Sequence, residues 1–157
     1  MYWQAPMLDR WIEPDALRRA FISAFGLDEA CITVIDFPNR WTGPIPPEPR
    51  IHLESVHRAG PFPQQLNVFI GGDEIARLVA DLTGTLDYAR ALARALNVTM
   101  LLGDGPIGHE EQLRVTPDGT VDIVELDGDE LDEERYVIVG SRPFTELPAS
   151  ATTAAAG

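Results

Sequence analysis

The spacing of apolar residues changes several times between the period of a helix and that of a strand, and this alternation limits the possible folds most strongly. Apolar residues recur at helical spacing between Pro14, which is tolerated in a first turn, and Gly26, which favours a helix end. Two further helices are expected over residues 73–82 and 85–97. Short β-branched or apolar runs predict strands at residues 31–35, 51–56, 66–70, 98–102, 112–116, 120–126 and 136–139.

This order of elements predicts an α+β fold, with about three helices packed on a mostly antiparallel sheet of about six or seven strands. A chain of 157 residues suits a single domain that buries about 70% of its unfolded surface. We expect this domain over residues 1–148. Residues 149–157 contain only small residues and threonine or serine, which predicts a flexible tail.

Three turn signals refine the prediction. Pro117-Asp118-Gly119 lies between two strand patterns and predicts a hairpin with its glycine at positive φ. Gly84 is expected to end the second helix, and Thr85 to cap the third. The run 98–102 is too apolar to alternate, so it predicts a central strand covered on both faces.

Residues 71–75, Gly-Gly-Asp-Glu-Ile, resemble the signature of the diguanylate cyclases. The resemblance covers five residues, and it would imply a nucleotide and metal site. The family has phenylalanine where this chain has Ile75, and its upstream aspartate-rich motif is missing here. An amphipathic helix begins at this point, so we interpret the segment as a glycine turn with Asp73 as the helix N-cap.

Five prolines between residues 38 and 49 surround Trp41 and predict an extended loop without regular hydrogen bonding. Pro44-Ile45-Pro46-Pro47 has the P-x-x-P spacing that an aromatic groove on another protein can bind. Alternatively, the loop is a rigid segment that folds Trp41 over the core of its own domain. The sequence favours the second interpretation, because this spacing is frequent wherever proline is abundant.

The charge of the chain excludes several functions. It has 25 acidic residues against 12 basic ones, a net charge of −13, and every basic residue is arginine. Without lysine, Schiff-base chemistry, pyridoxal-phosphate attachment and a Walker motif are excluded. Eleven of the acidic residues lie between residues 110 and 134, where Arg114 is the sole basic residue. Such a segment repels nucleic acid and attracts a basic protein surface.

We therefore expect the partner-binding residues in the acidic segment, with an aromatic anchor from the proline-rich loop. The candidates are Asp127, Asp129, Glu130, Asp132, Glu133, Glu134 and Trp41. The segment does not fit an EF-hand, because its sixth residue from Asp127 is Asp132 where glycine is needed. No cofactor or metal is expected. The alternative to a partner-binding surface is a solvated acidic face that serves solubility only.

Residues suited to catalysis are few. Cys31 begins an apolar strand, which favours core packing over a reactive thiol. The histidines, His52, His57 and His109, form no metal-binding motif. The expectation is therefore that the protein is not an enzyme, with a dispersed, hydrolase-like site of His109 and carboxylates as the alternative.

The sequence thus predicts a small acidic protein of the immunity or antitoxin type that neutralises a basic partner, such as a toxin enzyme. The N-terminus has neither a basic start nor an apolar run, so we expect a cytoplasmic location and no membrane segment. The acidic charge leads us to expect no nucleic-acid partner. An adaptor or structural domain is the remaining alternative. The oligomeric state is left open.

Overall fold

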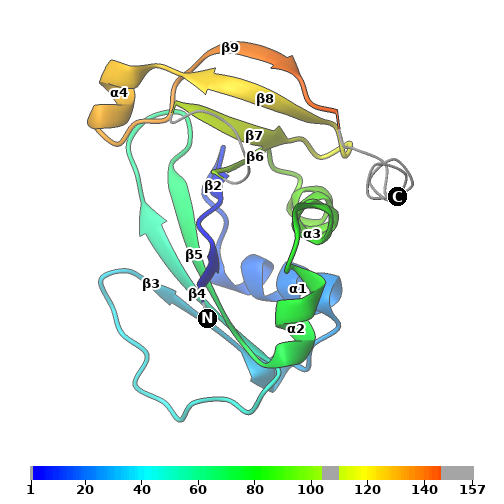
Figure 1. Ribbon diagram of the computed structural model, residues 1–157. Coiled ribbons are helices and arrows are strands. Elements are labelled where there is room, and N and C mark those ends of the chain that lie inside the picture. Colours follow the sequence, from blue (N-terminus) through cyan, green and yellow to red (C-terminus); the bar gives the residue numbers. More distant parts are fainter. Residues whose placement is uncertain (1, 104–109, 146–157) are drawn as a thin grey trace, which may run out of the picture.

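The computed structural model describes residues 2–103 and 110–145, which form one nine-stranded sheet and four α-helices (Figure 1). The predicted class, α+β with a mostly antiparallel sheet, is confirmed, whereas the predicted numbers of strands and helices are too low. The predicted tail 149–157 lies outside the described residues. The helices are α1 (Pro14–Phe25), α2 (Asp73–Leu78), α3 (Leu82–Leu96) and α4 (Gly128–Asp132). The strands are β1 (Tyr2–Gln4), β2 (Met7–Leu8), β3 (Ile32–Asp36), β4 (Arg50–His57), β5 (Gln64–Gly71), β6 (Met100–Leu102), β7 (Glu111–Val115), β8 (Val121–Leu126) and β9 (Ile138–Pro143).

The strands follow the order β3-β4-β5-β2-β6-β7-β8-β9, and β1 pairs with β5 beside β2. All pairings are antiparallel except that of β3 with β4. Figure 1 shows that the sheet bends, so that β3–β5 and β7–β9 form two walls with α1 and α3 between them. The main hydrophobic core lies between the helices and the inner face of this bent sheet.

The N-terminal strands were not expected, because residues 1–12 show no clear apolar period. Strand β2 contains only two residues, yet it pairs with β5 on one side and with β6 on the other. It therefore joins the two walls of the sheet. Such a short segment has no periodicity to read, since its strand conformation comes from partners that are distant in sequence.

Three predictions about helix ends are wrong. Gly72, not Asp73, is the N-cap of α2, and no side chain caps this helix. Gly84 does not end a helix but lies in the first turn of α3, where its N–H donates to the Asp81 carboxylate at 2.8 Å. Thr85 is therefore a buried helical residue rather than a cap. The predicted limits of α1 are confirmed, since Pro14 begins it and Gly26 follows it at a φ of 65°.

The remaining core predictions mostly hold. Met100–Leu102 form a central strand whose residues are all buried, as its apolar character predicts. Cys31 is buried, but it ends the short 3₁₀ turn Glu29–Cys31 rather than beginning β3. The last strand, β9, starts at Ile138 instead of at residue 136.

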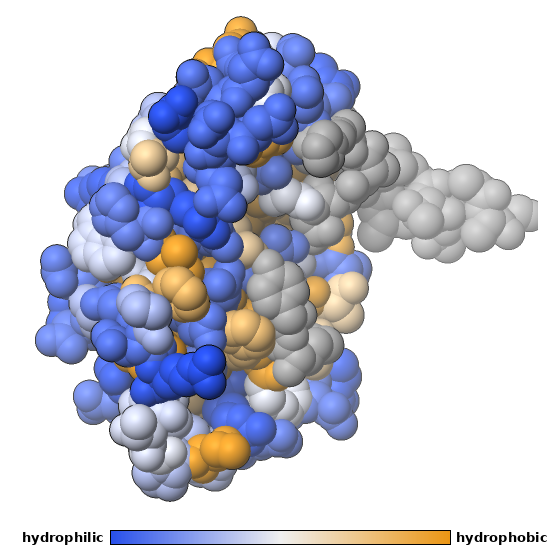
Figure 2. Space-filling model, turned by 90° about the vertical axis from the view of Figure 1, so that its left-hand side faces the viewer, coloured by the Kyte–Doolittle hydropathy of each residue, from blue (hydrophilic) through white to orange (hydrophobic). Residues whose placement is uncertain are grey.

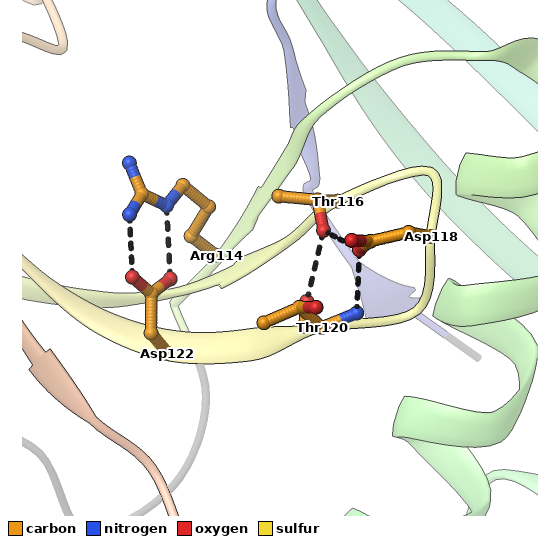
Figure 3. Close-up of polar contacts among 5 residues, drawn as sticks. All are labelled: Arg114, Thr116, Asp118, Thr120 and Asp122. Carbon is orange, nitrogen blue, oxygen red and sulfur yellow. Dashed lines mark hydrogen bonds and ion pairs between the residues drawn. The ribbon is translucent and has the colours of Figure 1, made fainter.

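The predicted hairpin is present, and its turn is held by side chains (Figure 3). The Asp118 carboxylate accepts hydrogen bonds from the Thr116 hydroxyl and from the Thr120 N–H, the latter at 3.0 Å. These bonds to the charged form lower the pKa of Asp118 to about 2. Arg114 and Asp122 face each other across the strands in a two-pronged ion pair, which fixes the same register.

Candidate partner-binding surface

The acidic segment after β8 is not a plain connection but contains the short helix α4. Asp127 is its N-cap, and its carboxylate accepts hydrogen bonds from the N–H groups of Asp129 and Glu130, at 3.0 and 3.1 Å. Negative side chains are favoured at this end of a helix by the backbone dipole. One of the predicted partner-binding carboxylates is therefore already used within the fold.

Two more of these carboxylates pair with the protein's own arginines. Glu130 accepts a hydrogen bond from Arg135 at 2.5 Å, and Glu134 pairs with Arg58 of the β4–β5 turn at 3.0 Å. The hydrogen bond that Arg135 donates to Glu130 raises the pKa of the Arg135 guanidinium. By contrast, Asp129, Asp132 and Glu133 are exposed, and their side chains make no ion pair within residues 2–103 and 110–145, although the charge of Glu133 also favours the charged form of Arg135 and so raises its pKa. The acidic segment is thus partly neutralised and partly free.

A cavity of about 400 Å³ next to α4 was missed by sequence reasoning. Its lining contains three glutamates and one arginine, on β7, β8, β9 and the residue before β7: Glu110, Glu111, Ile123, Glu125, Ser141 and Arg142. Arg142 pairs with Glu111 at 2.5 Å, and the Glu110 side chain lies against Gly128 at the start of α4. The carboxylates of Glu110 and Glu125 have no ion-pair partner in the described part of the chain.

Glu111 and Glu125 stand directly opposite each other in the antiparallel pairing of β7 and β8. Like charges at directly opposed positions destabilise a sheet. The predicted hairpin already implied this pairing, because a turn centred on Asp118 places residues 111 and 125 at equal distances from it. The sequence therefore contains a signal for this pair of opposed glutamates, namely the register of the hairpin.

Trp41 lies far from the acidic segment. It belongs to the loop that precedes β4, whereas α4 lies by the opposite end of that strand, about 25 Å away at 3.3 Å per residue (Figure 1). The interpretation in which Trp41 covers the domain's own core is wrong, because 43% of this residue is exposed. Its indole lies against Gly43, and its Nε1–H donates to the Pro44 carbonyl at 3.0 Å.

A hydroxyl, an imidazole and a carboxylate meet on β3 and β4. The Thr33 hydroxyl is hydrogen-bonded to Nδ1 of His52 at 2.5 Å, and Nε2 of His52 lies 3.8 Å from Glu54. Thr33 is only 4% exposed, so a substrate cannot reach its oxygen. The group is a link between strands and not a nucleophilic site. His109, the histidine of the predicted enzyme alternative, lies outside the described residues.

We expect His52 to make stability depend on pH. Burial disfavours its charged form and lowers its pKa below the ordinary 6.5, more than Glu54 raises it. His52 therefore binds a proton more tightly in the unfolded chain than in the folded protein. The contribution of neutral His52 to the free energy of unfolding is present above pH 6.5 and is lost as the pH falls below this value. The difference in free energy of unfolding between the wild type and His52→Gln, measured in urea, should shrink between pH 7.5 and pH 5. A difference independent of pH would contradict this assignment.

The comparisons with known proteins identify no relative: no family model, no curated protein and no solved structure matches this chain. Within the described residues, none of the helices has the length and apolar character needed to cross a membrane. Nor do these residues contain a group of three or more histidine, cysteine, aspartate or glutamate side chains that could hold a metal ion.

Proposed function

We propose that this protein is a small acidic binding domain of the immunity or antitoxin type, which neutralises a basic protein partner. The surface that carries this function is the acidic end of the molecule, formed by α4 and by the glutamate cavity on β7–β9. Figure 2 shows that this upper end is predominantly hydrophilic. The protein acts by binding and not by catalysis.

The observation that best supports the proposal is the excess of glutamates around the cavity: Arg142 pairs with Glu111, and Glu110 and Glu125 have no ion-pair partner among the described residues. Placing Glu111 opposite Glu125 costs stability, and adding Glu110 to the same cavity adds a third carboxylate against Arg142 alone. A local arrangement that opposes folding is typical of a functional site. An added cation would relieve it.

The binding mechanism has two stages. The exposed carboxylates of Asp129, Asp132 and Glu133 attract a basic surface over about 8 Å at physiological salt, which speeds the encounter. A guanidinium or ammonium group of the partner then enters the cavity and pairs with Glu110 and Glu125. Planar guanidinium pairs with carboxylates through two hydrogen bonds, so arginine is the better fit.

Removing two cavity charges should weaken the binding of a basic peptide. The double variant Glu110→Gln/Glu125→Gln should bind hexa-arginine about tenfold more weakly at low salt, a loss of about 1.4 kcal/mol. Calorimetric titration at 20 mM and 300 mM salt measures this. The variant should also be as stable as the wild type or more so, since it relieves the repulsion between opposed strands.

The matched control is Glu29→Gln/Glu74→Gln, which removes the same total charge from residues outside the cavity. Its affinity for hexa-arginine should stay within about twofold of the wild type. Equal weakening in both variants would show that net charge alone attracts the peptide, and would leave the solubility interpretation in place.

The neutralising role is tested by expressing the neighbouring reading frame of the source genome with this chain. Any growth arrest should be relieved by the wild type and by the control variant, but not by the cavity variant.

A further inference from the structure

The proline-rich loop between β3 and β4 concentrates the exposed apolar side chains of the protein. Five large apolar residues are exposed in the described chain, and three of them lie in this loop: Phe37 at 60%, Trp41 at 43% and Ile45 at 77%. Every residue from 36 to 45 is exposed. Figure 2 shows apolar atoms at the lower tip of the molecule, where Figure 1 places the loop. A monomer does not need such a cluster for folding.

The segment Pro44-Ile45-Pro46-Pro47 belongs to no helix and takes no part in a strand ladder. Proline fixes φ near −65°, and a residue before proline is driven out of the helical region, so this sequence favours a polyproline conformation. In that conformation, which has three residues per turn, Pro44 and Pro47 share one side. Both prolines are exposed.

Two neighbouring side chains hold this segment in place through its carbonyl groups. Trp41 donates to the Pro44 carbonyl at 3.0 Å, and Arg50, the first residue of β4, donates to the Pro46 carbonyl at 3.3 Å. Arg50 also pairs with Glu48 at 3.5 Å. A segment fixed in this way loses little conformational entropy when it binds, which favours affinity.

The charge of the loop differs from that of the rest of the chain. Residues 36–50 contain two acidic and two basic residues, Asp36, Arg40, Glu48 and Arg50, within a chain of net charge −13. An interface centred here therefore needs little desolvation of unpaired charge. The overall negative charge opposes both an anionic membrane and a second copy of the chain. An uncharged groove on another protein is not repelled by the negative charge of this chain.

From these observations we propose that Pro44 and Pro47, with Trp41 beside them, form a docking ridge for a protein with an aromatic-lined groove that binds P-x-x-P segments. This docking surface lies at the opposite end of β4 from the acidic cavity and is independent of the proposed neutralising function. Because its contacts are apolar, its affinity should be nearly unaffected by salt, whereas binding at the cavity weakens as salt rises.

The ridge can be tested by placing a photoreactive side chain on it. The variant Ile45→p-benzoylphenylalanine is irradiated in an extract of the native cells, and a second variant carries the same group at Val139 on β9, which is also exposed. We expect an adduct with one protein from position 45 and not from position 139. That protein is then purified, and its affinity for the unmodified chain is measured at 50 mM and 500 mM salt.

Pro44→Ala/Pro47→Ala should weaken this affinity at least tenfold, whereas Pro61→Ala/Pro143→Ala, which changes two exposed prolines elsewhere, should stay within twofold. The cavity variant Glu110→Gln/Glu125→Gln should leave it unchanged, so that failure here does not bear on the proposed function. The proposal is overturned if position 45 gives no adduct, gives one only with a second copy, or if the chain binds phosphatidylcholine vesicles through this loop. Equal affinities of the two proline variants also overturn it.

Discussion

Gln64→Ala should lower the free energy of unfolding by about 3 kcal/mol or more, the largest loss we expect from a single polar substitution. Gln64 is fully buried at the start of β5. Its side-chain oxygen accepts from the Ile12 N–H at 2.9 Å, and its nitrogen donates to the Ile12 carbonyl at 3.0 Å and to the Ser55 hydroxyl at 2.7 Å. Alanine would leave all three partners buried without hydrogen bonds, and it would open a cavity as well.

Through these hydrogen bonds, Gln64 on β5 connects Ile12, which lies between β2 and α1, to Ser55 on β4. The substitution should therefore loosen the contact between these segments. Its neighbour Gln65 is the matched control. Gln65 is half-buried, and its side chain accepts a hydrogen bond from Arg58 and donates one to Asn67. Gln65→Ala should cost less than about 1 kcal/mol. Urea denaturation of both variants measures the difference. Equal midpoints for the two would show that the buried network contributes nothing of its own.

Gly84→Ala should destabilise the protein by about 3 kcal/mol, although alanine is the better helix former by about 1 kcal/mol. A Cβ atom at this position would lie 2.0 Å from the carbonyl oxygen of Leu78, at the end of α2. The obstacle is backbone and not a movable side chain. Either α2 or the first turn of α3 would have to shift, and the hydrogen bond from Gly84 to Asp81 would be strained.

Thr83→Ala is the control for helix propensity, because Thr83 lies in the same turn of α3 and is exposed. This substitution should leave stability unchanged or raise it slightly. Thermal unfolding of both variants separates the two effects. If Gly84→Ala melts at or above the wild-type temperature, the close packing of α2 against α3 is not as the structure shows it.

Sequence reasoning located the acidic surface but not the state of its charges. The acidic excess and the hairpin register are local properties, so Glu111 opposite Glu125 follows from a turn at Asp118. The pairing of Glu134 with Arg58 joins residues far apart in sequence, across two turns at the same end of the molecule. No local pattern encodes such a contact. The sequence predicts six partner-binding carboxylates in one segment. The structure reduces this candidate site to three of them, Asp129, Asp132 and Glu133, and adds the glutamate cavity beside them.

The sequence by itself determined the ends of α1, the β7–β8 hairpin, the buried central strand and the absence of helix and strand from the proline-rich loop. Each follows from forces that act over a few residues: fixed proline φ, glycine at positive φ, capping and apolar period. Only the tertiary structure decided that Met7 and Leu8 join two walls of a sheet, and that Gly84 is needed inside a helix. A two-residue strand and a close backbone contact are stabilised by partners that the fold brings from elsewhere in the chain. Short-range sequence preferences cannot predict those partners, because they depend only on neighbouring residues.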